Sequence, residues 1–532
     1  MRSKLRYVAM AAVMSLLYTS CYEDKGNYTY TDKDIITITL PEDIKAMSHA
    51  EYLNITPTIH SSINGTIDAD NTDYEYGCRL NYPWYNAEEG KNEQWIDIDS
   101  TRSKDVKFFA NLPAGTYKIW YWVKSKSTGV TTNAQGIVKV LSSTYQGWMV
   151  LNNVGADNTV RLDMISQDSK GNVSIARNLL GSKAPKLTGG TQLVLNPSKY
   201  VNGESIFLLS RSGGFRLNVN DLQTTVGDDM KLNDFILPST PGQPVSMLIV
   251  NNGSSVGPMS RLTVTDIGNA YAITSNTSGA SFENPINTEK RDAEPVFQVS
   301  PMMGTSMARP GNSSCALLYD VTNKRFLGWN YRANDNHITF PLNDPEGSLK
   351  KFSYQTGMEL IAMKSTRYSD GLVYSVLQDD QKKRHVYGIN LSGSKFNQES
   401  KYEDITAEHF NDATDYAFHS QFPLMFYYYG NKVYSYNLGT GALSDVLTLD
   451  ASETVTMIKF NLFMNMQLSD LNDNSDEFLG KQYQLIVAST TGAADGGVIR
   501  LYKVDPTGKM SKAEEYKGFG KVVDVTYRER RK

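Results

Sequence analysis

Cysteine is scarce in this chain. Its 532 residues include only three cysteines, Cys21, Cys78 and Cys315. A zinc site built from clustered cysteines needs more thiols than this, so a site of that kind is excluded. Cys78 and Cys315 fall in regions that we predict to be separate domains, so we expect no disulfide between them. We expect both to be small buried hydrophobic residues.

Positive charge is not in excess either. The chain has 53 lysines and arginines against 57 aspartates and glutamates, which gives a formal net charge of −4. Without a basic surplus, nucleic-acid binding is not expected. We interpret the basic segment 528–532 as a solvated tail. Beyond the first twenty residues, no apolar run reaches the roughly 20 residues that a membrane-spanning helix needs.

Recognisable catalytic motifs are also lacking. The six histidines form no His-Glu-x-x-His pair, and the Gly-x-Ser-x-Gly and phosphate-loop spacings do not occur. We interpret His409 and His419 as surface or internally bonded core histidines. The acidic stretches 68–73 and 470–477 lack the central glycine of a calcium-binding EF-hand loop, which favours solvated loops. We therefore expect no catalytic residue, metal or cofactor, although counting acids does not exclude a glycosidase pair.

The first twenty residues have the pattern of a secretory signal. Three basic residues are followed by an apolar run over 7–17 and then by Thr19, Ser20 and Cys21. Ending at a cysteine resembles a lipobox, although Tyr18 stands where leucine is usual. We predict a signal peptide over 1–20, cleavage before Cys21 and lipid on its thiol, where several acyl chains would anchor stably. The alternative is an ordinary secretion signal with an incidental cysteine.

The residues around this cysteine resemble a known family. The stretch that carries the resemblance is Ser20-Cys21-Tyr22-Glu23-Asp24-Lys25-Gly26-Asn27-Tyr28. It is similar to the start of the PKD-like family lipoproteins of Bacteroidota. In that phylum, acids directly after the lipid cysteine are associated with display on the outer face of the outer membrane. The resemblance also implies neighbours, namely a SusC/SusD-type transporter pair and other surface lipoproteins.

The rest of the chain is predicted to be all-β. It contains 32 tyrosines and 40 glycines, and short alternating runs recur between Gly, Asn, Asp and Ser residues. After a linker at 21–28, residues 29–142 are predicted to form a PKD-like, immunoglobulin-like sandwich. Its clearest strand lies within 112–123 and places Tyr117, Ile119, Tyr121 and Val123 on one face. A Gly-Thr-Tyr turn into such a strand resembles the late hairpin of PKD domains.

Residues 145–532 carry a longer repeat. Seven apolar strands can be counted, at 148–151, 205–209, 246–250, 315–319, 372–377, 424–429 and 483–488. They begin roughly 40 to 70 residues apart, and most precede a turn and a second alternating strand, which favours a seven-bladed β-propeller. Gly430 and Asn431 are expected in a tight hairpin that needs positive φ. Two stacked sandwiches are the alternative.

The end of the repeat region predicts ring closure. Residues 521–527 alternate like the first strand of a blade, but no blade follows them. The first unit, which opens at Gly147, has in turn no recognisable inner strand of its own. We predict that the C-terminal strand pairs beside residues 147–166 and so removes two sheet edges.

Two groups of residues are candidates for binding. Tyr82, Trp84 and Tyr85 stand in a polar loop, where exposed rings can stack on sugars or on apolar peptide side chains. The alternative is that they pack against the neighbouring domain. The methionine-rich segment 301–307 could offer an adaptable apolar surface, and core filling is the alternative.

Together these features predict a lipid-anchored protein of the outer membrane that faces the extracellular side. We expect a non-catalytic accessory subunit of a SusC/SusD-type, TonB-dependent uptake complex, binding oligosaccharide or peptide cargo or acting as a scaffold. One alternative is a surface propeller hydrolase or lyase that acts on glycans. Another is a purely structural partner with no small ligand.

Overall fold

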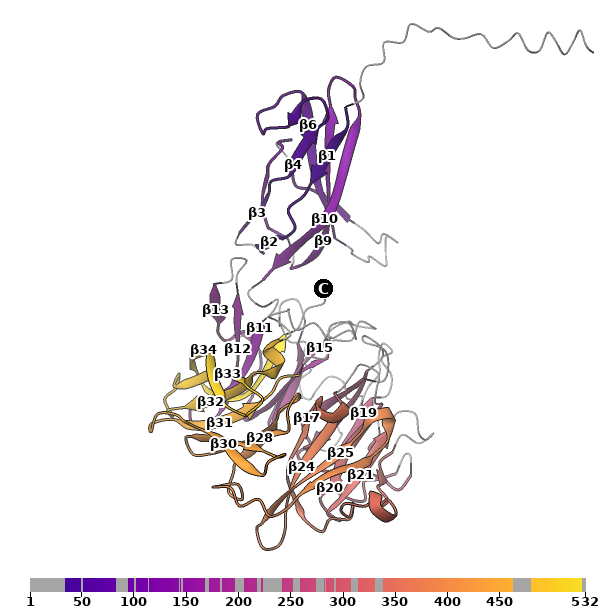
Figure 1. The fold of residues 1–532 in the computed structure, drawn as a ribbon, viewed down its shortest axis with the longest axis vertical. Coiled ribbons are helices and arrows are strands. Elements are labelled where there is room, and N and C mark those ends of the chain that lie inside the picture. The colour runs from indigo at the N-terminus through magenta and orange to yellow at the C-terminus, as the bar shows by residue number, and fades with distance from the viewer. Residues whose placement is uncertain are drawn as a thin grey trace, which may run out of the picture. The chain divides into compact units, whose positions relative to one another are not determined.

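A computed structural model describes most of the chain between residues 34 and 528. The ranges not described within these limits are 49–50, 83–93, 100–101, 113, 143, 145–146, 168–171, 182–183, 197–204, 218–221, 223–241, 252–258, 274–281, 283, 291–292, 308–313, 331–337 and 463–479. The regular elements in the described part are strands and 3-10 turns of three residues, so the all-β prediction is confirmed. Two compact units divide the chain (Figure 1). The second contains Val140–Lys532 together with Lys45–Glu51 and Ala110–Gly115.

In the described part of the chain, ten strands come before the repeat region. They are β1 (Ile36–Thr39), β2 (Ile44–Met47), β3 (Tyr52–Ile55), β4 (Thr58–Ser61), β5 (Gly65–Thr66), β6 (Tyr74–Tyr82), β7 (Gln94–Asp97), β8 (Val106–Phe109), β9 (Gly115–Ser125) and β10 (Thr131–Leu141). They form sheets in the orders β1-β4-β5, β2-β10-β9-β6-β7 and β3-β8. Tyr117, Ile119, Tyr121 and Val123 of β9 are all buried, as the alternation predicted. The short strands β2, β4, β5 and β8 were not predicted.

Seven antiparallel sheets follow in chain order. The first two contain β11 (Gly147–Val154), β12 (Thr159–Gln167), β13 (Val173–Ala176) and β35 (Lys521–Arg528), then β14 (Gly190–Asn196), β15 (Ser205–Ser210) and β16 (Gly213–Leu217). The third and fourth contain β17 (Pro244–Asn251), β18 (Met259–Thr265) and β19 (Ala270–Ile273), then β20 (Cys315–Asp320), β21 (Arg325–Asn330) and β22 (Phe340–Pro341).

The last three sheets have four strands each. The fifth contains β23 (Glu359–Ser365), β24 (Leu372–Gln378), β25 (Arg384–Asn390) and β26 (Asn397–Tyr402). The sixth contains β27 (Asp415–Phe418), β28 (Leu424–Tyr429), β29 (Lys432–Asn437) and β30 (Ala442–Thr448). The seventh contains β31 (Thr454–Lys459), β32 (Leu485–Thr490), β33 (Gly497–Val504) and β34 (Met510–Phe519). Each of the seven predicted apolar strands falls in a different sheet.

Hydrophobic packing joins these sheets into a ring. One buried cluster lies between each pair of consecutive sheets, from Leu151 and Leu208 between the first two to Phe426 and Val487 between the last two. A further cluster, which includes Trp148 and Ile486, joins the seventh sheet to the first. Two stacked sandwiches would pair sheets face to face, whereas each sheet here packs between two others. This closed arrangement is that of a β-propeller.

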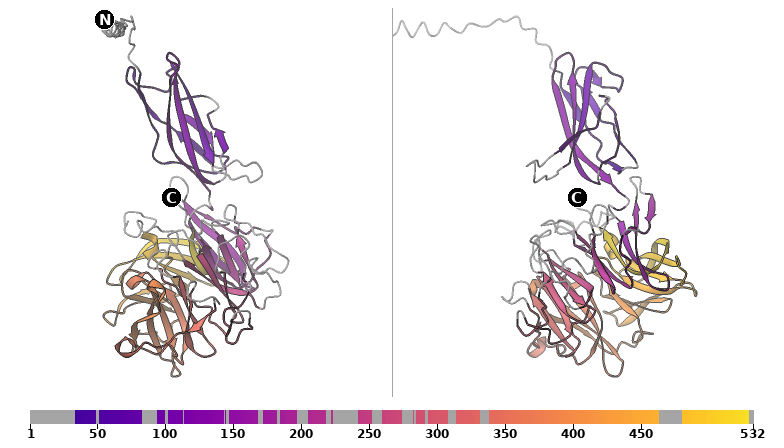
Figure 2. Two further views of the ribbon diagram at one scale, coloured as in Figure 1. Left: turned by 90° about the vertical axis from the view of Figure 1, so that its right-hand side faces the viewer. Right: turned by 180° about the vertical axis from the view of Figure 1, so that it is seen from behind.

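The C-terminal strand closes the ring as predicted. Strand β35 pairs antiparallel with β11, with Val525 opposite Val150 and Tyr527 opposite Trp148. The rings of Trp148 and Tyr527 meet edge to face at 4.8 Å between centroids. Figure 2 shows the yellow C-terminal strands beside the purple strands that open the ring. The first sheet therefore takes its innermost strand from the far end of the repeat region.

Side chains also bond the inner strands to one another. Asp524 of β35 accepts from the backbone N–H of Leu193 at 2.9 Å and pairs with Lys459 of β31 at 2.7 Å. Gln192 both donates to and accepts from the backbone of Met247 in the next sheet. Bonds of the same kind join Thr305 to Ser365 and Lys364 to Asp415. These bonds tie neighbouring sheets together near the axis of the ring.

Local details bear on other predictions. Gly430 has φ of 60° in the β28–β29 hairpin, where positive φ was expected. Met303 packs between the third and fourth sheets and Met302 against the fourth and fifth, so these side chains serve mainly as core. Cys78 and Cys315 are buried thiols. The seventh apolar strand begins at Leu485, because Tyr483 belongs to a 3-10 turn at Lys481–Tyr483.

Candidate functional site

The residues predicted to bind ligand or lipid lie outside the described part of the chain or directly beside a range that is not described. Cys21, Trp84 and Tyr85 are outside the described residues. Tyr82 is the last residue of β6, and the segment that follows it leads to β7. The roles proposed for these four residues therefore stay predictions.

Three tryptophans stand on the strands that flank this segment. On β9, Trp120 and Trp122 alternate with the buried side chains and so lie on the opposite side of the five-stranded sheet. Trp95 of β7 is 40% exposed, and its ring meets that of Trp120 edge to face at 5.9 Å. We call this side of the sheet, with Trp95, Trp120 and Trp122, the aromatic face.

A glycine makes room for one of these rings. Gly77 of β6 stands opposite Trp122 of β9. A Cβ atom at Gly77 would lie 2.2 Å from the Trp122 ring, closer than any side chain tolerates. The absence of a side chain therefore lets the indole lie flat against the neighbouring strand.

Charged groups lie among the rings of the aromatic face. Arg79 stands opposite Trp120 on one side and Asp97 on the other, and its guanidinium lies 5.5 Å from the centre of the Trp95 ring. Arg102 lies 5.8 Å from the centre of the Trp122 ring and pairs with Asp97 at 3.0 Å. Both members of that pair are about half exposed. The face thus offers aromatic surface, hydrogen-bond donors and a carboxylate acceptor together.

A cavity of about 210 Å³ opens among the inner strands of the ring. Its lining is Gln192, Leu193, Val194, Leu195, Met247, Leu248, Ile249, Met307, Ser365, Phe460, Asn461, Leu462 and Thr526. These residues are apolar or carry amide and hydroxyl groups, and none of them is charged. Several of the polar groups already bond the inner strands, as Thr526 does by donating to the carbonyl of Leu193 at 2.8 Å. This lining can hold a small neutral group but offers no carboxylate or imidazole for proton transfer.

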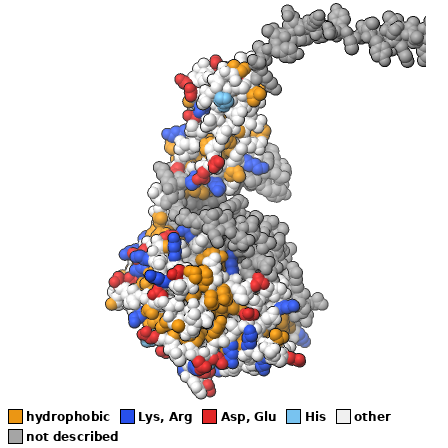
Figure 3. Space-filling view, in the orientation of Figure 1, with side chains coloured by type: hydrophobic (Ala, Val, Ile, Leu, Met, Phe, Trp, Pro, Cys, Tyr) orange, Lys and Arg blue, Asp and Glu red, His pale blue; other side chains and the backbone are white. Residues whose placement is uncertain are grey.

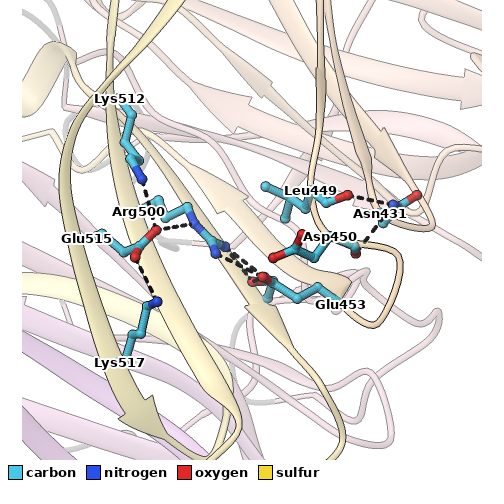
Figure 4. A network of polar contacts seen from close by, with 9 residues as sticks. Asn431, Leu449, Asp450, Glu453, Arg500, Lys512, Glu515 and Lys517 are labelled. Atoms are coloured by element: carbon cyan, nitrogen blue, oxygen red, sulfur yellow. Dashed lines mark hydrogen bonds and ion pairs between the residues drawn. The ribbon is translucent and has the colours of Figure 1, made fainter.

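A largely buried ion-pair network lies in the seventh sheet (Figure 4). The Arg500 guanidinium donates to both carboxylate oxygens of Glu453, at 2.7 and 2.9 Å, and to Glu515 at 2.8 Å. Hydrogen bonding to Arg500 lowers the pKa of Glu453. Bonds from Lys517, and then from Arg500 and Lys512, lower the pKa of Glu515 to about 2. Because these charges satisfy one another, the network joins strands rather than activating a substrate.

The histidines fit the roles expected of them. His419 is buried, its Nδ1 accepts from the backbone N–H groups of Gln421 and Phe422, and burial lowers its pKa to about 4. His409 stacks on Tyr429 at 4.2 Å between ring centres. Within the described ranges, no three His, Cys, Asp or Glu side chains are grouped to hold a metal ion. In the same part of the chain, no helix has the length and apolar character to cross a membrane.

Comparison with known families places the N-terminal part of the chain. Residues 21–192 match the PKD-like family. The matching PKD-like region contains β1 to β10 and continues to β14 in the second sheet of the ring. No curated protein matches the sequence.

Solved structures with a similar course of the chain come partly from Bacteroides. A quinonprotein alcohol dehydrogenase-like protein from Bacteroides thetaiotaomicron is 11% identical, with a TM-score of 0.39 over 91% of this chain and 96% of that one. A DUF4784 family protein from Bacteroides caccae is 10% identical, with a TM-score of 0.31 over 77% and 95%. A chain of the mitotic checkpoint complex is 12% identical, with a TM-score of 0.33 over 64% and 90%. Similarities this distant carry no information on function.

Sequence reasoning missed the aromatic face. The strand at 112–123 was interpreted through its buried face, and the two tryptophans that alternate with that face were not considered as contact residues. The sequence did contain a signal, because a strand with aromatic residues on both sides exposes the aromatic residues of one side unless a second layer covers that side.

Proposed function

We propose that this protein is a non-catalytic accessory lipoprotein of a SusC/SusD-type uptake system, displayed on the outer membrane and binding extracellular nutrient. The observation that carries the proposal is the aromatic face. Tryptophan has a large apolar surface, and three such rings on an outward side of a sheet favour a contact role. The interspersed Arg79, Asp97 and Arg102 add the polar groups that give a contact its orientation.

The cellular location in this proposal is inferred from the N-terminal sequence. Cys21 as the lipidated residue, followed by Glu23 and Asp24, supports an anchor on the extracellular side of the outer membrane. We propose that the ring, as a seven-bladed propeller, is a rigid support for partner contacts. Its cavity lining, with amides, hydroxyls and apolar side chains, supports holding rather than chemical conversion.

Anchoring can be tested at one residue. The Cys21→Ala variant is expected to lose the lipid and to leave the membrane fraction or to stay unprocessed, because no other thiol stands at the predicted cleavage point. The measurement is fractionation with metabolic labelling by a clickable palmitate. A Cys78→Ala variant is the matched control and should keep its label. Normal cleavage and unchanged membrane attachment of Cys21→Ala would reject the lipoprotein assignment.

The functional assignment can be tested by purification from native membranes. The tagged protein is expected to co-purify with a SusC/SusD-type pair and to leave oligosaccharides and peptides chemically unchanged. Replacing Tyr82, Trp84 and Tyr85 together by alanine should weaken nutrient or partner binding with little change in melting temperature. A large loss of stability would identify them as core residues. Turnover of a glycan or peptide by the pure protein would overturn the non-catalytic assignment.

A further inference from the structure

We infer that the aromatic face binds an oligosaccharide rather than a peptide. This inference rests on the proposed function and names the class of nutrient. The site consists of Trp95, Trp120, Asp97, Arg79 and Arg102. Trp95, Trp120, Asp97 and Arg79 belong to β6, β7 and β9, so the sheet fixes their positions, and Arg102 joins them through its ion pair with Asp97.

The rings provide the apolar part of the site. Carbon-bound hydrogens on one side of a sugar ring form a flat apolar surface that packs on an aromatic ring, and indole is the largest ring available. Trp95 is the most open of the three tryptophans, and its edge-to-face contact with Trp120 holds it in place. The Arg79 guanidinium over the Trp95 ring restrains this ring further. An indole restrained in this way loses little conformational freedom when a ligand stacks on it.

The polar groups provide the second part. Asp97 lies two residues beyond Trp95 on the same side of β7, about 7 Å along the strand. Its carboxylate accepts hydrogen bonds, while Arg102, 3.0 Å away, donates them. Adjacent hydroxyls of a sugar each donate and accept, so a half-exposed carboxylate–guanidinium pair matches two of them at once. The spacing lets one sugar stack while its hydroxyls reach the pair.

The location on a sheet face distinguishes sugar from peptide. Extended peptides that add a strand to a sheet are recognised through backbone hydrogen bonds at the open edge of that sheet. Strand β7 is the edge of this sheet, and a peptide strand added there would lie in the plane of the sheet, whereas the rings of the aromatic face project away from that plane. A ligand that lies on the aromatic face therefore meets side chains, namely the indoles and the Asp97–Arg102 pair.

The test is affinity electrophoresis of the full-length protein. Native gels would contain amylopectin, arabinoxylan, pectic galactan, polygalacturonate, yeast mannan or mucin, and a casein digest would be tested by fluorescence titration. We expect retardation by at least one polysaccharide and no saturable binding of the digest. Trp95→Ala with Trp120→Ala should weaken the polysaccharide interaction roughly tenfold or more. Asp97→Asn, which preserves shape, should weaken it with an unchanged melting temperature.

The control is Ile63→Ala, since Ile63 is an exposed hydrophobic residue between β4 and β5, which belong to the sheet β1-β4-β5 and not to the five-stranded sheet. It should bind like the unaltered protein. Casein peptides that bind through Trp95, or polysaccharide binding indifferent to Trp95 and Asp97, would overturn this inference but not the proposed function. So would retardation by none of the six polysaccharides. Polysaccharide binding without any co-purifying SusC/SusD-type pair would instead overturn the proposed association and leave the inference standing.

Discussion

A chain that ends before Lys521 is expected to lose the stable ring. Strand β35 buries Val522, Val525 and Tyr527 in the cluster that joins the seventh sheet to the first. Burying a large apolar side chain contributes about 1.5–3 kcal/mol, so these three alone contribute roughly 5 kcal/mol. That is comparable with the whole stability of many domains, about 5–15 kcal/mol. We expect the truncated protein to melt far below the full chain or to be recovered as aggregate.

The matched control for this truncation is a chain that ends at Arg528. It retains β35 entirely and should melt like the full-length protein, as measured by calorimetry or by far-ultraviolet circular dichroism. The loss of β35 should also leave the backbone groups along one edge of β11 unpaired, so that other chains can pair with them. If the chain that ends before Lys521 melted with the full-length protein, β35 would not be the strand that holds the ring closed.

The second large effect is expected from Arg500→Met. Arg500 and Glu453 are 9% and 6% exposed, and the substitution would leave the Glu453 carboxylate buried without its partner. Removing one member of a buried ion pair typically costs about 3–5 kcal/mol. Urea unfolding at pH 7 would measure the change in free energy of unfolding. Lys512→Met, which removes an exposed partner of Glu515, is the control and should cost less than about 1 kcal/mol.

A double variant separates the pair from its surroundings. Arg500→Met combined with Glu453→Gln removes both charges and should recover part of the lost stability.

The unaltered protein should also lose stability on acidification. Glu453 and Glu515 have folded-state pKa values below those of the unfolded chain, so their contribution is complete above about pH 5 and falls as they protonate. Arg500→Met should show a weaker acid dependence. An Arg500→Met protein as stable as the Lys512→Met control would contradict this account.

The parts of the fold that could be predicted share one physical property. The second strand of most sheets is covered on both sides by neighbouring sheets, so it appears in the sequence as a continuous apolar run, as in β15 and β24. Outer strands such as β30 have mostly exposed side chains and leave no such signal. In the first unit, β4 and β8 each have a single buried apolar residue, Ile59 and Val106, which leaves little periodic pattern in the sequence. Ring closure was predictable because β35 alternates without a following partner.

The candidate site could be predicted only in part. The loop aromatics were recognised because burial is hard to achieve in a polar segment. The aromatic face depends on register, because Arg79 meets Trp120 and Asp97 only when β6 pairs with both β9 and β7. Those pairings link residues 18 and 41 positions apart, and no local pattern encodes them. The same holds for Arg500 and Glu453, which meet only across the completed seventh sheet.

The pairing of β35 with β11 also sets the order of events during folding. Every other described strand of the ring precedes β35 in the chain, so one edge of β11 stays unpaired until β35 folds onto it. Contacts between such distant segments form slowly, because the intervening chain must first be brought together. An open ring with a free edge is vulnerable to aggregation during that interval. We therefore expect the folding of this protein to depend on chaperones until β35 has paired with β11.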